Sequence, residues 1–98
     1  MTMTKKKDGT TLTITVEGKL DAMTSPEVAA GLEQDLDGVE KLFWDFEKLD
    51  YISSAGFRVL LIAENMLEDP DQMKVLHANE LVQAAFILTG QGSMLLED

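Results

Sequence analysis

This chain contains no cysteine, which excludes a disulfide framework, a thiolate metal site and a cysteine nucleophile. Basic residues are few: eight Lys and Arg stand against eighteen Asp and Glu, giving a formal net charge of -10. This charge repels phosphate backbones and anionic lipid headgroups, so we expect no nucleic-acid partner and no membrane partner. Long hydrophobic runs and an apolar signal core are also missing, so we expect a cytoplasmic protein.

Several motifs of catalysis are absent as well. The sequence has neither G-x-x-x-x-G-K-[ST] nor G-x-G-x-x-G, so nucleotide binding has no support. His77 is the single histidine, and its apolar neighbours indicate a strand residue rather than a metal ligand or a general base. A serine nucleophile would lack both a G-x-S-x-G elbow and a second histidine. We therefore expect no cofactor, no metal and no hydrolase chemistry.

What is present indicates one small globular domain over residues 1–98. The chain is 45% hydrophobic and 27% charged, enough for one modest core. Residues 11–17 alternate polar and apolar side chains, which is typical of a strand with one buried face. Asp8-Gly9 is a hairpin-turn dipeptide, so we expect residues 2–7 to form a Lys-bearing edge strand that pairs back on this strand.

The rest of the chain alternates between helical and strand patterns. We predict a helix from Ser25, as the N-cap, to about Leu36, a central strand over 41–46 and a helix over 54–67. A strand over 73–77, a helix capped by Asn79 that ends at Gly90, and a short last strand over 93–96 follow. This order predicts an α/β fold in which an N-terminal β-hairpin precedes alternating helices and strands in a mixed open sheet.

A pair of serines stands where the strand-like segment 49–52 runs into the helix that begins near residue 54. A helix N-terminus presents unpaired N–H groups and a partial positive charge. Ser53 can therefore cap the helix, and a phosphate on Ser53 or Ser54 would be stabilised there. The simpler interpretation is that both serines only cap and turn the chain.

Two loops follow strands and lead into helices, over residues 18–25 and 50–56. Sites in open α/β sheets lie beyond the carboxyl ends of the strands. If the two strands are neighbours, Asp21, Thr24, Ser53 and Ser54 share one surface. Among the acidic residues, Asp45 is the one that we place near a site, because it lies at the end of the expected central strand.

Three further residues near these loops have two interpretations. Met23 and Phe57 are either core residues or exposed apolar contacts. Arg58 is either a solvated helix residue or a group that pairs with an acidic partner or a phosphate.

Three segments resemble the STAS domain family, specifically the single-domain anti-sigma factor antagonists of bacterial partner-switching systems. Residues 18–24, GKLDAMT, resemble the family's G-x-L-D-x-x-T loop, and residues 42–46, LFWDF, its apolar strand ending near Asp. Residues 50–57, DYISSAGF, resemble its D-x-x-[DS]-S-[ST/A]-G-L motif. The resemblance implies a STAS-like fold over nearly the whole chain.

The resemblance also implies a binding partner rather than an enzyme. In the family, the serine that aligns with Ser54 is phosphorylated by an anti-sigma factor that is also a serine kinase, and a PP2C-type phosphatase removes the phosphate. The unphosphorylated form binds the kinase and frees its sigma factor. Many members have Asp where Ser53 stands and a hydroxyl residue where Ala55 stands, so Ser53 is a rival acceptor.

Carried over position by position, the resemblance implies a partner-binding set of Asp21, Thr24, Ser53, Ser54, Gly56, Phe57 and Arg58. Because the chain ends soon after Leu96, we expect the family's usual final helix to be shortened or missing. We expect a monomer or a weak dimer. One alternative is a STAS scaffold, a regulatory subunit of a transport or signalling complex without serine phosphorylation. Another is a small serine-dependent enzyme that uses Ser54.

Overall fold

The computed structural model, which describes residues 1–95, begins with the predicted β-hairpin. β1 (Thr2–Asp8) pairs antiparallel with β2 (Thr11–Leu20), and Gly9 closes the turn with a φ of 62°. Leu12, Ile14 and Val16 are buried while the residues between them are half-buried. The period-two pattern of the sequence therefore places one face of β2 against the core.

The remaining elements follow the predicted order. They are α1 (Ser25–Asp35), β3 (Lys41–Asp45), β4 (Leu49–Ile52), α2 (Ser54–Met66), the 3₁₀ turn η1 (Pro70–Gln72), β5 (Met73–Leu76), α3 (Glu80–Leu88) and the 3₁₀ turn η2 (Gly92–Met94). The strands form one five-stranded mixed sheet of order β1-β2-β3-β5, with β4 also paired to β2. The predicted α/β fold with a mixed open sheet is confirmed.

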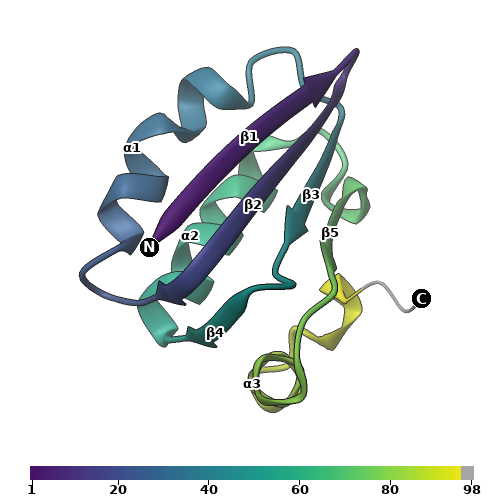
Figure 1. The fold of residues 1–98 in the computed structure, drawn as a ribbon. Helices are drawn as coiled ribbons and strands as arrows, with labels where there is room; N and C mark the ends of the chain where they lie inside the picture. Colours follow the sequence, from purple (N-terminus) through teal and green to yellow (C-terminus); the bar gives the residue numbers. More distant parts are fainter. Residues whose placement is uncertain (96–98) are drawn as a thin grey trace.

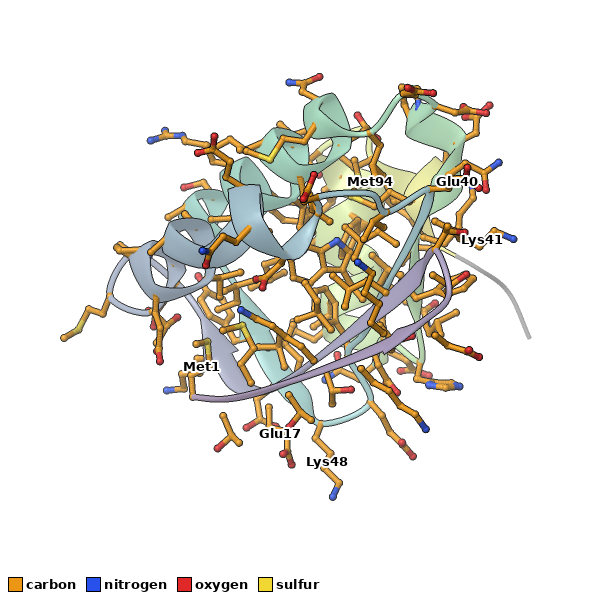
Figure 2. The ribbon with its side chains drawn as sticks, turned by 90° about the horizontal axis from the view of Figure 1, so that it is seen from above. Met1, Glu17, Glu40, Lys41, Lys48 and Met94 are labelled. Carbon is orange, nitrogen blue, oxygen red and sulfur yellow. The ribbon has the colours of Figure 1, made fainter. Side chains whose placement is uncertain are left out.

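The helices are not spread evenly over the sheet. α1 and α2 lie on one face, behind the strands in Figure 1, and α3 lies near β4 and β5. Figure 2 shows the same layering from above, with β1 and β2 on one side and α1 and α2 on the other. Trp44, Phe46 and Phe86 are fully buried in the core between these elements. Within residues 1–95, no helix is long and apolar enough to cross a membrane.

Two lysines of β1 connect the hairpin to α1. Lys5 forms an ion pair with Asp35, and Lys7 Nζ donates a hydrogen bond of 3.2 Å to the backbone carbonyl of Asp37. The register pairs Lys5 with Ile14 and Lys7 with Leu12, so these lysines share the helix-facing side of the sheet. The edge strand is thus anchored to the helical layer.

The structure corrects three predicted boundaries. α1 begins one residue earlier than expected: Thr24 occupies the N-cap position, and Ser25 is a buried first helical residue. The expected last strand is the turn η2 followed by a single bridge from Leu95 to Val75, and Leu96 lies outside the described residues. β5 stops at Leu76, because His77 adopts a φ of 60° and leaves the extended conformation.

Candidate functional site

The loop that carries Asp21 and Thr24 and the segment that carries Ser53 and Ser54 follow neighbouring strands. β2 and β4 are parallel, with Leu20 opposite Ile52 at their carboxyl ends. The backbone N–H of Ser53 donates a hydrogen bond of 2.9 Å to the carbonyl of Leu20, which fastens the two ends together. The loop that carries Asp21 and Thr24 therefore leaves the sheet beside the start of α2, as the sequence predicted for adjacent strands.

Gly18 explains how β2 reaches β4. β2 pairs with β3 from Thr11 to Thr15 and with β4 from Gly18 to Leu20. The register shifts between Gly18 and Lys19, and Gly18 has a φ of 96°, which glycine adopts with little strain. Its N–H donates to the carbonyl of Lys48 at 3.0 Å. Gly18 thus lets β2 pair with both β3 and β4.

An ion pair lies close to this change of partner. Glu17 Oε1 is 3.7 Å from Lys48 Nζ, and the two residues are neighbours in Figure 2. Both side chains are substantially exposed, so we assign this pair little stabilisation.

The loop of residues 21–24 is held by its own side chains. Asp21 Oδ1 accepts hydrogen bonds from the N–H groups of Met23 at 3.0 Å and Thr24 at 3.1 Å. Thr24 Oγ1 accepts from the N–H of Asp21 and donates to the carbonyl of Lys19, each at 2.9 Å. The bonds from Thr24 and Met23 lower the pKa of Asp21 below its ordinary value. Asp21 and Thr24 therefore act first as the locks of this loop.

The two serines occupy different environments. Ser53 has the extended backbone of an N-cap residue, yet its side chain makes no capping bond. Its Oγ is buried and has no hydrogen-bond partner within residues 1–95. Ser54 is the first residue of α2 and is exposed. The predicted side-chain cap at Ser53 is therefore wrong, and Ser54 offers the accessible hydroxyl.

Gly56 and Phe57 shape the site from beneath. A Cβ on Gly56 would lie 2.7 Å from the carbonyl oxygen of Leu20 and 2.7 Å from Ile52 Cγ1. Only glycine therefore lets α2 approach β2 this closely. Phe57 is 8% exposed and packs edge-on against Phe86 at 4.7 Å between ring centroids. Of the two interpretations of Phe57, the core residue is confirmed and the exposed contact is wrong.

The exposed groups of the two loops are partly apolar. Met23 is 90% exposed, as the interpretation as a contact residue requires, and Tyr51 of β4 is 46% exposed. Sequence reasoning missed Tyr51, because the sequence of this four-residue strand does not show which of its faces other elements cover. Arg58 is also exposed, one turn into α2.

Asp45 is engaged elsewhere. Its Oδ1 lies 3.2 Å from His77 Nδ1 and accepts a hydrogen bond of 3.1 Å from the N–H of Glu47. The structure thus joins Asp45 to His77, which follows β5, and not to the serines. Sequence reasoning missed this pair, since 32 positions separate the two residues.

A mixed five-stranded sheet with an exposed serine at the start of α2 defines a small α/β domain. The family model of the STAS domain matches residues 2–84, and the chain belongs to this family. No curated protein sequence matches the chain.

Solved structures share the fold. The anti-sigma factor antagonist SpoIIAA in its unphosphorylated form has a TM-score of 0.88 at 21% identity, covering 99% of this chain and 88% of that chain. An anti-sigma factor antagonist from Mycobacterium paratuberculosis has a TM-score of 0.86 at 18% identity, covering 99% and 86%. The Bacillus cell fate determinant SpoIIAA in the phosphorylated form has a TM-score of 0.69 at 19% identity, covering 99% and 91%.

Proposed function

We propose that this protein is an anti-sigma factor antagonist, a cytoplasmic binding module switched by phosphorylation of Ser54. In its unphosphorylated form it binds an anti-sigma factor serine kinase and so releases the sigma factor. A PP2C-type phosphatase restores this form after phosphorylation. The observation that carries the proposal is the contrast between the exposed Ser54 and the buried Oγ of its neighbour Ser53.

Accessibility favours Ser54 over Ser53 as the acceptor. A kinase must bring the γ-phosphate of ATP in line with the hydroxyl oxygen that attacks it. Ser53 Oγ is covered, and the N–H of Ser53 is tied to Leu20, so presenting it would require the β2–α2 junction to open. Ser54 needs no such opening.

The start of α2 can hold a phosphate without unfolding. The first N–H groups of a helix lack intrahelical partners and carry a partial positive charge. The first turn of α2 contains no acidic residue that would repel the phosphate. Phosphorylation adds a charge of about -1.5 to -2, so the switch changes the docking surface while the fold remains.

The surrounding surface supports recognition of a protein partner. The locked 21–24 loop carries Met23, and β4, which ends just before Ser53, carries Tyr51; both side chains are exposed. Exposed apolar side chains around a small hydroxyl suit a partner shaped for neutral Ser54. A phosphate on Ser54 would place negative charge where the partner contacts a neutral hydroxyl.

Binding of variants to an anti-sigma factor serine kinase tests the proposal. Ser54→Asp should abolish binding, Ser54→Ala should bind and resist phosphorylation, and circular dichroism should show both folded. Ser93→Asp makes the same change at another exposed serine and serves as the matched control. Binding of Ser54→Asp equal to that of Ser93→Asp would contradict the switch and support the unphosphorylated scaffold.

A further inference from the structure

Three side chains of types that bind metals lie close together, at a different place from Ser53 and Ser54. Ligand atoms of Asp45, Glu47 and His77 all lie within 4.8 Å of one another. Asp45 ends β3, Glu47 begins the turn to β4, and His77 follows β5. The phosphorylation switch uses none of these three side chains, so a ligand site at this cluster is distinct from the phosphorylation site.

The backbone brings these side chains together. β3 and β5 are parallel, with Asp45 opposite Leu76, so both strands deliver their next residues to the same edge. The N–H of Phe46 donates to the carbonyl of Leu76 at 3.0 Å, which fixes the two chain ends side by side. The positions of Asp45 and His77 are therefore set by the sheet itself.

The spacing of the ligand atoms suits a metal ion. In a tetrahedral site, metal bonds of about 2.0–2.2 Å place adjacent ligand atoms about 3.3–3.6 Å apart. His77 Nδ1 and Asp45 Oδ1 are 3.2 Å apart, close to the short end of this range. Glu47 is exposed, so its carboxylate can rotate to complete a third position without disturbing the core.

The donor types select the class of ion. One imidazole with two carboxylates suits divalent first-row transition metals such as Zn²⁺ and Co²⁺, whereas Ca²⁺ and Mg²⁺ prefer sites built from oxygen alone. The net charge of -10 favours cation binding in general. The sequence contains one histidine and no cysteine, so binding through a ring nitrogen can occur only at His77.

We propose that Asp45, Glu47 and His77 bind one divalent transition-metal ion, with water in the remaining positions. The ion would bridge the β3–β4 turn to the segment after β5. It would thereby link the end of β3 to the segment after β5. The linked turn leads into β4, the strand before Ser53.

Titration of the untagged full chain with ZnCl₂, followed by calorimetry, tests the proposal. We expect one equivalent of Zn²⁺ to bind and to raise the melting temperature, because the ion binds the folded site. Nuclear magnetic resonance should show the ring signals of His77, the single histidine, shifting with the same midpoint.

Three variants should each weaken Zn²⁺ binding by at least about tenfold: Glu47→Gln, Asp45→Asn and His77→Asn. Asn tolerates the φ of 60° at residue 77 and removes the ring, and Glu47→Gln alters an exposed side chain, so these two should fold. Glu33→Gln, an identical change at an exposed position of α1, is the matched control.

Three results would overturn the site. They are absence of Zn²⁺ binding to the wild type, unchanged affinity in His77→Asn, and equal weakening in Glu33→Gln. Binding of MgCl₂ as tight as that of ZnCl₂ would overturn the assignment to a transition metal.

Discussion

Gly56→Ala tests the close approach of α2 to β2, which positions Ser53 and Ser54. The new Cβ would meet the Leu20 carbonyl oxygen and Ile52 Cγ1, each at 2.7 Å. Real Cβ contacts are not this short, so the start of α2 must move away from β2. The carbonyl cannot yield easily, because it accepts the hydrogen bond from Ser53 at 2.9 Å.

Three contributions set the size of the effect. Overpacking costs about 1–3 kcal/mol, and loss of the Ser53–Leu20 hydrogen bond costs about 1 kcal/mol. Replacing glycine inside a helix returns about 1 kcal/mol. We therefore expect the free energy of unfolding to fall by about 1–3 kcal/mol and the melting temperature by roughly 5–20 °C.

Urea unfolding followed by the fluorescence of Trp44, the single and fully buried tryptophan, measures this change. Gly31→Ala is the matched control in α1, since its Cβ would meet only the flexible ends of Lys5 and Asp35, each at 3.0 Å. It should leave stability within about 1 kcal/mol of the wild type. Equal stability of Gly56→Ala and Gly31→Ala would refute the reasoning.

Three further predictions concern single side chains of the site. Ser53→Ala removes a buried hydroxyl that has no partner within residues 1–95, so the free energy of unfolding should stay constant or rise by up to about 1 kcal/mol; a larger loss in urea unfolding would reveal a bond at this oxygen. Phe57→Ala should cost about 3–5 kcal/mol and Phe57→Leu less than about 1.5 kcal/mol, and thermal melts that rank the two equally would contradict its place in the core. Hydrogen bonds from Thr24 and Met23 hold the pKa of Asp21 below its ordinary 3.8, so its folded value lies below its unfolded value. The ionised carboxylate then stabilises the protein above the unfolded pKa, and this contribution is lost as the pH falls through the folded pKa. The difference in free energy of unfolding between wild type and Asp21→Asn should accordingly narrow from about pH 4 downward. A difference that widens in acid would show that folding raises the pKa of Asp21.

The sequence predicted the elements well, because local patterns determine them. Alternation in residues 11–17 predicted β2, and Asn79 caps α3 as expected, with its Oδ1 accepting from the N–H of Val82 at 2.8 Å. The rule that sites lie beyond strand ends predicted the two loops as the site, on the condition that their strands are neighbours, and the pairing of β2 with β4 meets that condition. Helix ends moved by only one or two residues.

What the sequence could not predict depends on contacts between distant segments. The burial of Phe57 depends on Phe86, which approaches it from another helix. The burial of Ser53 Oγ depends on how closely α2 meets β2, and Gly56 sets that distance. The Asp45–His77 pair requires the β3–β5 register and the left-handed turn at residue 77.

Site-mapping mass spectrometry after incubation with ATP and an anti-sigma factor serine kinase tests the central claim most directly. The wild type and Ser53→Ala should each gain one phosphate on Ser54, and Ser54→Ala should gain none. Phosphate on Ser53, or a wild type that no such kinase phosphorylates, would contradict the account.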